Sequence, residues 1–349
     1  MNDLTTGDLA KWAELQRADR RYASAFLRPE FVQWLSELRD DIRVVVLKEG
    51  DSTVGFFPYE HSGFAGHSAG NPLSLCQAVV AEPDCRWNGI ELLRAADLRR
   101  IVFDYWIENQ SEIKPFRTVT AQCPFIDLSN GFEAYLAAKN ANGSKPFYDI
   151  SRKQRKLERE HGPVKCELIS NADAVAELIK WKSAQCQRTH VADLFKFGWP
   201  AQLLTNAVTQ GSEACGALLW GLRSNTKLIA INVLLRSHEH AHGWFMAFDR
   251  SYASYSPGMV LIHKMLHELA SRGITRLDLG KGATGYKKRL MSDTTIVYEG
   301  IIDTDPAVRA VWQQWHQARN WLRESRLRPL AHRANRLVSN VRWLMGKHY

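Results

Sequence analysis

The segment of residues 244–272 contains a junction that is suited to binding an anion. An apolar run at 244–249 predicts a strand, and residues 258–272 carry apolar side chains at helical spacing. Ser256, Pro257 and Gly258 stand between the two. A helix N-terminus presents unpaired backbone N–H groups and the positive end of its dipole, and a glycine lets a ligand approach them closely. The junction therefore predicts a pyrophosphate site. The alternative is that Ser256 caps the helix and Pro257 fills its first position with no ligand involved.

A second strand and a glycine-rich loop follow this helix. Residues 274–280 predict a strand parallel to the one at 244–249, and residues 281–285 predict the loop. Two adjacent parallel strands joined by a helix leave a ligand crevice at their carboxyl ends. Tyr286 comes directly after the loop, so we expect its phenol either to face the crevice or to pack on the body of the protein.

Cysteine and histidine spacing gives no metal signature. The six cysteines have no pair at the two-residue gap that lets thiolates share a zinc ion, so we expect reduced thiols. His238, His240 and His242 alternate in a predicted hairpin. His263 and His267 lie four apart on the predicted helix, but a lysine stands where a zinc protease has its glutamate base. We therefore expect solvated histidines and no metal.

The elements that must position these residues occur in one order twice. Two helices within 9–38 precede a hairpin at 43–57, a strand near 78–81 and a helix at 88–104. Further on, a helix at 172–187 precedes strands at 214–222, 227–235 and 243–249 and the helix at 258–272. This order predicts two similar α/β lobes, residues 1–128 and 129–303, in which mixed sheets are flanked by helices. A basic helical tail, residues 304–349, completes the chain.

Composition agrees with two domains and locates the charge. The chain has 349 residues, 45% of them hydrophobic, which is enough for two cores. Residues 307–349 carry nine basic residues against one acid, whereas the rest of the chain carries 37 against 36. Of the net charge of +9, the tail carries +8 and the rest of the chain +1, so we expect no nucleic-acid groove across the lobes. A basic stretch at 151–160 predicts either a solvated linker face or contact with an anionic substrate.

The targeting signals favour a cytoplasmic location. The Met1 end lacks a basic start followed by an apolar run, and no stretch approaches the roughly 20 apolar residues of a membrane span. We expect a cytoplasmic protein that at most contacts the inner face of the membrane peripherally.

A set of short motifs resembles one family. The second half carries Asp249, Tyr252, Tyr255-Ser256-Pro257-Gly258, Asp278-Leu279-Gly280 and Tyr286-Lys287 in that order. The N-terminal half carries 26-FLRPEF-31, 54-VGFFP-58 and 70-GNPLS-74, and the middle carries 155-RKLEREHG-162 and 181-WKSAQ-185. Over residues 20–303 this pattern is similar to the GNAT-type acetyltransferase domain of bacterial polysaccharide-biosynthesis proteins of the CelD-like group, which are related to the FemAB peptidyltransferases.

The resemblance implies two tandem GNAT-like lobes, an acyl-CoA donor such as acetyl-CoA, and an amine acceptor on a sugar or peptide. The second lobe would be catalytic, and the first structural or on the acceptor side. The donor would contact Phe248, Tyr255, Ser256, Pro257, Gly258, Met259 and Lys287. Lys182, Gln185 and Arg188, three apart on one helix, would line the acceptor side.

Acyl transfer from a thioester to an amine needs an oxyanion site, a proton acceptor and a proton for the thiolate. Backbone N–H groups at 246–248 would hold the thioester oxygen, Asp249 or Asp278 would accept the amine proton, and Tyr286 would protonate the thiolate. Helix capping and loop bracing are the alternative roles for the two aspartates.

Two other functions stay open at this point. An aminoacyl transferase that uses aminoacyl-tRNA would need strong, salt-sensitive RNA binding, for which the near-neutral lobes offer little charge. A catalytically silent module that scaffolds polysaccharide assembly would keep the fold without thioester turnover.

The tail is interpreted from its physical pattern alone. Asp305 and Pro306 predict a helix start, Pro329 a break, and residues 330–345 a second helix with an apolar stripe and arginines. Three roles are open for this helix. Its apolar stripe packs on the body of the protein, or it lies in an anionic lipid surface, or its arginines bind an anionic nucleotide or another regulatory ligand. The arginines in question are Arg323, Arg326, Arg328, Arg333 and Arg336.

Overall fold

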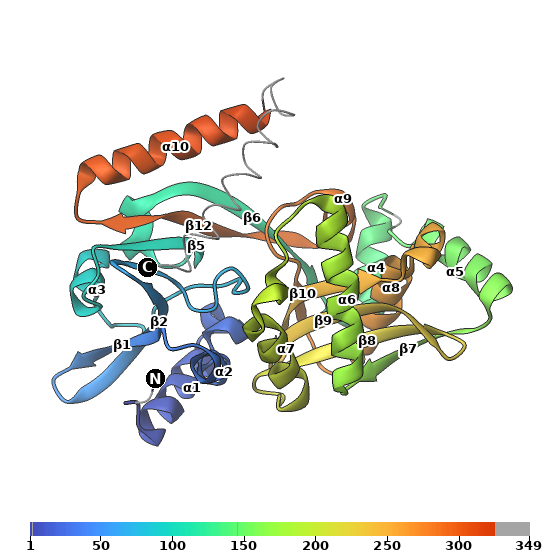
Figure 1. Cartoon of the computed structure of the whole chain (residues 1–349), viewed down its shortest axis with the longest axis horizontal. Helices are drawn as coiled ribbons and strands as arrows, with labels where there is room; N and C mark the ends of the chain where they lie inside the picture. Colours follow the sequence, from blue (N-terminus) through green and yellow to red (C-terminus); the bar gives the residue numbers. More distant parts are fainter. Residues whose placement is uncertain (2, 145, 325–349) are drawn as a thin grey trace.

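The computed structural model describes residues 1, 3–144 and 146–324, and shows two α/β lobes side by side (Figure 1). The first lobe is built on strands with helices packed around them. Its elements are α1 (Thr6–Ala18), α2 (Pro29–Leu38), β1 (Ile42–Glu49), β2 (Ser52–Ser62), β3 (Ala65–Ser68), β4 (Val80–Ala81), α3 (Gly89–Ala95), β5 (Arg100–Ile107) and β6 (Arg117–Asp127).

The second lobe follows a similar order with additional helices. They are α4 (Gly131–Ala141), α5 (Tyr148–His161), β7 (Val164–Ile169), α6 (Ala172–Thr189), α7 (Trp199–Thr209), β8 (Gly216–Ser224), β9 (Lys227–Ser237), β10 (His240–Phe248), α8 (Pro257–Ser271), β11 (Arg276–Asp278), α9 (Gly285–Leu290) and β12 (Asp293–Asp303). In each lobe an antiparallel run of strands leads through a crossover helix, α3 or α8, to a parallel strand, because β3 pairs with β5 and β10 with β11 in parallel. The two mixed-sheet lobes predicted from the sequence are confirmed.

The lobes exchange their last strands. In the described residues all twelve strands form one sheet, in the order β1-β2-β3-β5-β12-β6-β11-β10-β9-β8-β7, with β4 added beside β2. β12, the last strand of the second lobe, pairs with β5 of the first, and β6 of the first pairs with β11 of the second. β6 and β12 also pair with each other. The two lobes are therefore joined by backbone hydrogen bonds across their boundary.

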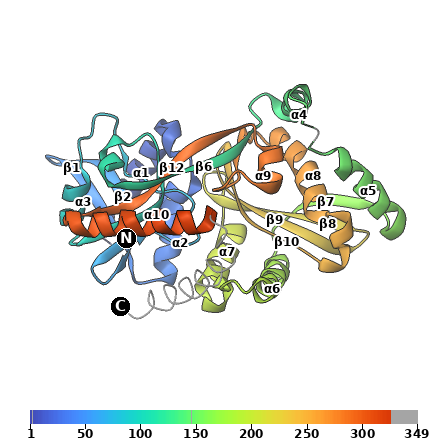
Figure 2. The ribbon, with the colours of Figure 1, turned by 90° about the horizontal axis from the view of Figure 1, so that it is seen from above.

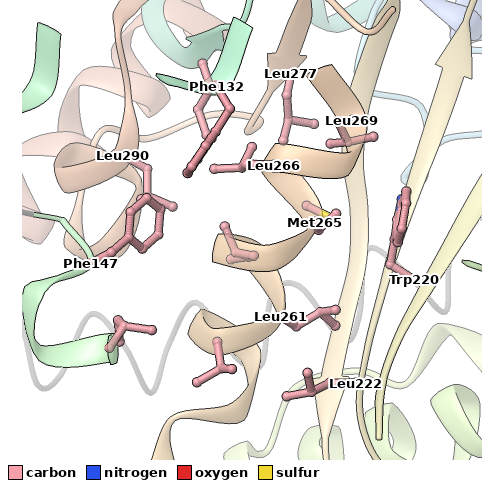
Figure 3. Packing of buried hydrophobic residues seen from close by; sticks show 14 of the residues in the cluster. Phe132, Phe147, Trp220, Leu222, Leu261, Met265, Leu266, Leu269, Leu277 and Leu290 are labelled. Carbon is pink, nitrogen blue, oxygen red and sulfur yellow. The ribbon is translucent and has the colours of Figure 1, made fainter. Parts of the chain in front are cut away.

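Helices cover both faces of the second lobe's sheet (Figure 2). α6 and α7 lie on one face, and α4, α5 and α8 on the other. α8 is the buried helix of this lobe, since its apolar side chains pack between the sheet and the 132–147 region (Figure 3). The packed side chains include Leu261, Met265, Leu266 and Leu269 of α8, Trp220 and Leu222 of β8, and Phe132 and Phe147.

The core continues from one lobe to the other. The aromatic rings of Phe26 and Phe31 in the first lobe meet Trp244 of β10 edge-on, with ring centroids 6.1 and 6.3 Å apart. The indole N–H of Trp244 also donates to the carbonyl oxygen of Leu73 at 3.1 Å. β10 is thus held on one side by the first lobe and on the other by α8.

One predicted element is wrong. Residues 88–104 were expected to form one helix, but α3 ends at Ala95 and a strand, β5, begins at Arg100. Asp97 takes the left-handed backbone conformation (φ 52°), which stops the helix. The β-branched and aromatic residues at 101–107 favour a strand, and the inward-facing Ile101 and Phe103 are fully buried.

The first part of the tail forms α10 (Pro306–Glu324), which lies along β12 and β6 (Figures 1 and 2). It begins where the sequence predicts, and a carboxylate oxygen of Asp305 accepts from the Ala307 N–H at 2.8 Å. α10 packs on the body of the protein, whereas the apolar stripe predicted at residues 330–345 lies outside the described residues. Among the residues that the structure describes, no helix has the length and apolar character needed to cross a bilayer.

Candidate active site

The two central parallel strands of the second lobe separate after a short pairing. β10 pairs with β11 only over 240–242 and 276–278, and beyond Gly243 it has a partner on its β9 side alone. The register with β9 also shifts between Gly243 and Phe245, which marks a bulge at Trp244. Backbone groups of residues 244–248 on the β11 side are therefore free to bind a ligand, as the acyl-transfer hypothesis requires.

A cavity of about 250 Å³ lies in this gap. The second lobe contributes most of its wall through Gly243, Trp244, Phe245, Met246, Ile262, Met265, Leu277, Leu279, Gly280, Lys281, Tyr286 and Lys287. Asn232 and Leu234 of β9 line it as well. The first lobe adds Leu75 and Tyr105, so the cavity lies at the junction of the two lobes.

The N-terminus of α8 opens beside the cavity. Ser256, in the left-handed conformation, precedes Pro257 at the first helical position, and its side chain makes no capping hydrogen bond to the helix. The N–H groups of Met259 and Val260 turn back to the Ser256 carbonyl oxygen at 2.9 and 3.1 Å. The Ser256 hydroxyl therefore does not cap α8, whereas Pro257 does fill the first helical position, as that alternative expects.

A lysine from α5 meets this junction instead. Lys153 Nζ donates to the Ser256 hydroxyl oxygen at 2.7 Å, and Lys156 Nζ lies 5.5 Å from the centre of the Tyr255 ring. Tyr255 is itself held by α5, since its phenol donates to a Glu160 carboxylate oxygen at 2.6 Å. A positive side chain and the positive end of a helix dipole thus face one point, an arrangement that favours a phosphate group.

Gly258 and Met246 connect the helix terminus to the cavity. A β-carbon at position 258 would lie 3.2 Å from Met246 Sδ and 3.8 Å from Phe248 Cδ1. Met246 lines the cavity, so a ligand can extend from the α8 terminus along β10 into it. Phe248 flanks the same path.

We expect Gly258→Val to raise the Kd for acyl-CoA about tenfold or more, because its side chain fills the approach to the first-turn backbone. Met246 is flexible enough to yield, so the fold should persist. Gly7→Val, at the start of the remote helix α1, is the matched control and should leave the Kd unchanged. Calorimetric titration with acetyl-CoA gives the Kd values, and equal affinity in the Gly258 variant would place the donor elsewhere.

Tyr286 stands in the first turn of α9, with its ring packed against the core and its side chain in the cavity wall. Burial raises the pKa of its phenol, so the group is protonated at neutral pH and able to act as an acid. Lys287 Nζ donates to the Lys281 carbonyl oxygen at 2.9 Å and so braces the glycine-rich loop. Lys281 Nζ is paired with Asp104 and with Glu299, the latter at 2.7 Å.

The two predicted proton acceptors differ in their surroundings. Asp249 caps the 3-10 turn Arg250–Tyr255 by accepting from the Ser251 N–H at 2.9 Å, and it pairs with Lys227 at 2.8 Å. It does not line the cavity, so its contacts favour the bracing role. Asp278 lies beside the cavity on β11 and is buried.

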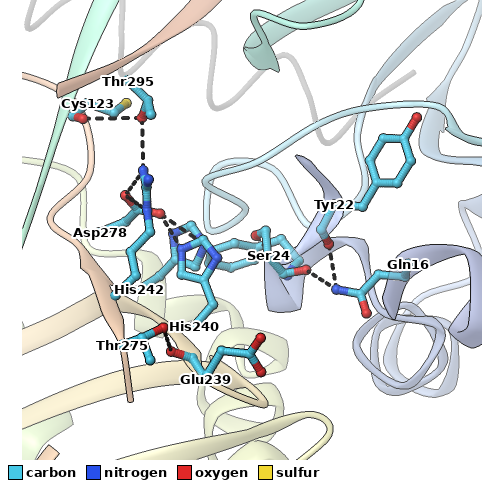
Figure 4. Close-up of polar contacts among 12 residues, drawn as sticks. Gln16, Tyr22, Ser24, Cys123, Glu239, His240, His242, Thr275, Asp278 and Thr295 are labelled. Atoms are coloured by element: carbon cyan, nitrogen blue, oxygen red, sulfur yellow. Dashed lines mark hydrogen bonds and ion pairs between the residues drawn. The ribbon is translucent and has the colours of Figure 1, made fainter. Parts of the chain in front are cut away.

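Asp278 is held by three basic side chains. Its Oδ1 accepts from Arg276 Nη2 at 2.8 Å, and its Oδ2 pairs with His240 Nε2 and faces His242 Nε2 at 3.8 Å (Figure 4). Burial alone would raise the pKa of Asp278, but the charge and hydrogen bond of His240 outweigh it, aided by His242 and Arg276. The pKa therefore lies well below its usual range. Such a carboxylate is a weak base and fits a positioning role better than proton abstraction.

The predicted acceptor residues lie away from the cavity. Lys182, Gln185 and Arg188 share α6, which covers the opposite face of the sheet from α8, and none of them lines the cavity. Burial lowers the pKa of Lys182, whose Nζ donates to Gln185 Oε1 at 3.3 Å. Arg188 donates to the carbonyl oxygen of Ala184 in its own helix.

The expectation of solvated histidines is wrong for two of them. His242 is 5% exposed, and the side chain of His240 is 12% exposed, because the first lobe covers this face of β10. The expectation of reduced thiols is consistent with the structure, in which all six cysteines are free. Arg326, Arg328, Arg333 and Arg336 lie outside the described residues, as does the side chain of Arg323, so the tail hypotheses stay predictions.

Sequence reasoning missed contributions from other parts of the chain. Lys153 was visible only as one of several basic residues in the stretch 151–160, and no local pattern pairs it with Ser256, 103 positions away. Leu75, between β3 and β4, and Tyr105, on β5, reach the cavity from the first lobe. Their role depends on non-local pairing that sequence periodicity does not encode.

Comparisons with known proteins agree with this geometry. Residues 144–288 match the family model described as an acetyltransferase (GNAT) domain. A search of the curated proteins found no match. The C-terminal domain of a putative lysylphosphatidylglycerol synthetase from Agrobacterium fabrum is similar in structure, at 16% identity, 90% coverage of this chain, 97% of that chain and a TM-score of 0.55.

Two further solved structures share the arrangement. FemX is similar at 8% identity, covering 84% of this chain and 94% of its own, with a TM-score of 0.55. A conserved protein of unknown function from Bacteroides thetaiotaomicron covers 86% and 97%, at 14% identity and a TM-score of 0.53. At these identities the likeness establishes the fold alone. Together with the family match, residues 144–288 are similar to a GNAT acetyltransferase domain, and the whole chain shares the two-lobed fold of these solved structures.

Proposed function

We propose that this chain is an N-acyltransferase that moves an acyl group, acetyl in the simplest case, from acyl-CoA to the amine of a sugar in exopolysaccharide assembly. The proposal includes membership of the CelD-like group and a cytoplasmic site of action, peripheral to the inner membrane face. The observation that supports it best is the gap between β10 and β11. This gap connects the N-terminus of α8, where Lys153 adds positive charge, to a cavity lined by unpaired backbone groups of β10 and by the Tyr286 phenol.

The donor would lie along β10. Its pyrophosphate would meet the first turn of α8 at the Gly258 N–H, with Lys153 as a counter-charge beside Ser256 and Tyr255. The pantetheine arm would follow Met246 into the cavity, and the thioester oxygen would accept from backbone N–H groups left free at 246–248. Lys287 would keep the glycine-rich loop in place below the thioester.

Acyl transfer then follows from the groups around the cavity. The neutral amine attacks the thioester carbonyl carbon, the C–N bond forms, and the resulting oxyanion is held by the backbone N–H groups. When the C–S bond breaks, the Tyr286 phenol gives its proton to the thiolate, and the proton lost by the amine restores the phenol through solvent. The acceptor would enter between the lobes, past Leu75 and Tyr105.

A thiol-release assay tests this function. The full-length protein would be given short- and long-chain acyl-CoAs with a panel of amino sugars, and bound CoA would be measured in parallel. We expect thiol release that depends on both substrates. CoA binding without turnover would favour the scaffold function, and transfer only from aminoacyl-tRNA would favour the aminoacyl transferase.

The role of Lys153 gives a quantitative test of the donor site. Lys153→Met should raise the Kd for acetyl-CoA about tenfold, since a charge-assisted hydrogen bond is worth about 1.5 kcal/mol or more. This loss of affinity should be smaller at high salt, because Lys153 is half-exposed and salt screens its charge. Lys165→Met, which removes an exposed lysine from β7, is the control. Titrations at low and high ionic strength measure the effect, and equal affinities of both variants would argue against a phosphate at Ser256.

A further inference from the structure

Two histidines and an aspartate converge where the pairing of β10 and β11 ends. His240 and His242 occupy alternate positions of β10, so both side chains leave the same face of the sheet. Asp278 of β11 is the register partner of His242. One ring nitrogen of each histidine and one carboxylate oxygen of Asp278 lie within 4.8 Å of one another (Figure 4). Three donor atoms of metal-ligating type thus meet in one place.

One of these donors has no hydrogen-bond partner. His242 Nε2 is buried, makes no hydrogen bond in the described residues, and lies 3.8 Å from Asp278 Oδ2. Phe26 of the first lobe closes the site edge-on, at 5.2 Å between ring centroids. A buried imidazole nitrogen that is aimed at a carboxylate and unpartnered is a position for an additional bound group.

The carboxylate is oriented as a metal ligand would be. Arg276 holds Oδ1 through two nitrogens, at 2.8 and 3.2 Å, so Oδ2 alone faces the two imidazoles. Ligating carboxylates in metal sites are commonly fixed by such outer hydrogen bonds. The Arg276 contact thus leaves Asp278 Oδ2 oriented toward the two histidines.

We propose that His240 Nε2, His242 Nε2 and Asp278 Oδ2 bind a divalent transition-metal ion of the zinc type. Two imidazole nitrogens and one carboxylate oxygen form a donor set that suits Zn²⁺. Ligand atoms of a tetrahedral zinc ion lie about 3.4 Å apart, so His242 Nε2, at 3.8 Å from Asp278 Oδ2, is nearly in place. The direct hydrogen bond between His240 and Asp278 would have to open to admit the ion. The ion would fasten β10 to β11 at the base of the gap, and this role is independent of the proposed acyl transfer.

Metal binding by the full-length protein tests the proposal. Protein treated with a chelator would be titrated with ZnCl₂ by calorimetry, and its zinc content measured after dialysis. We expect one equivalent, a higher Tm with zinc, and a Co²⁺ spectrum without thiolate charge-transfer bands. His242→Gln should lower the affinity more than about 100-fold, and Arg276→Gln about 10–100-fold.

His263→Gln is the matched control. His263 is a half-buried histidine with an unpartnered ring nitrogen, but it stacks on Phe147 at 4.4 Å and lies outside the cluster. Its variant should bind zinc as the unmodified protein does. If His242→Gln fails to fold, as judged by circular dichroism, His240→Asn carries the same test. No stoichiometric zinc uptake, uptake unchanged in the histidine variant that folds, or thiolate bands with Co²⁺ would overturn the proposal.

Discussion

Tyr286→Phe is expected to lower kcat by about 10²–10⁴-fold while the Kd for acyl-CoA changes little. The range is that of general acid–base catalysis by one positioned side chain. The substitution removes only the phenolic oxygen, so the packing of the ring against the core of the second lobe is kept. Single-turnover thiol release would report the chemical step, and titration with acetyl-CoA would report binding.

The control for this prediction is Tyr252→Phe. Tyr252 lies in the turn before α8 and does not line the cavity, so its loss should leave turnover intact. In the unmodified enzyme the rate should fall at high pH, where the Tyr286 phenol, whose pKa burial raises, loses its proton. The Tyr286→Phe variant has no phenol to deprotonate, so its rate should not show this fall. Normal turnover of Tyr286→Phe would remove this residue from the mechanism.

Asp278→Asn is expected to lower the free energy of unfolding by about 3 kcal/mol at neutral pH. A buried ion pair that loses one partner typically costs about 3–5 kcal/mol, and the lower end applies because Arg276 is partly exposed. The asparagine leaves Arg276 and His240 without the carboxylate that they share. Urea unfolding of both proteins would measure the difference.

The same variant has a defined pH dependence. The folded-state pKa of Asp278 is depressed, so its stabilisation is complete above the unfolded pKa near 4 and is lost as the pH falls toward the folded value. The difference in free energy of unfolding between the two proteins should therefore decrease by about 1 kcal/mol between pH 6 and pH 3. Asp51→Asn, in the exposed β1–β2 turn, should change stability by less than about 0.5 kcal/mol. A difference in free energy of unfolding that stays constant with pH would contradict a depressed pKa for Asp278.

Local elements were predictable from the sequence because their signals are local. The β8–β9 hairpin follows from two apolar runs around a short polar turn, in which Asn225 takes the left-handed conformation that asparagine tolerates. The start of α8 follows from Pro257 and Gly258, and the start of α10 from Asp305 and Pro306. Each of these depends on residues within a few positions of one another.

The strand exchange between the lobes, the burial of His240 and His242, and the position of Lys153 were not predictable in this way. β6 and β12 pair across more than 160 positions, and a lone strand pattern does not name its partner. His240 and His242 alternate as a half-exposed strand would, and only the first lobe's cover makes them buried. Lys153 likewise acquires its position from the packing of α5 on α8.

A crystal structure of the full-length protein with acetyl-CoA or CoA would test the central claim most directly. We expect the pyrophosphate within hydrogen-bonding distance of the Gly258 N–H and Lys153 Nζ, the pantetheine arm in the gap between β10 and β11, and the sulfur near the Tyr286 phenol. CoA bound in the first lobe, or in the second lobe with its phosphates away from the α8 terminus, would contradict the donor site described for this chain.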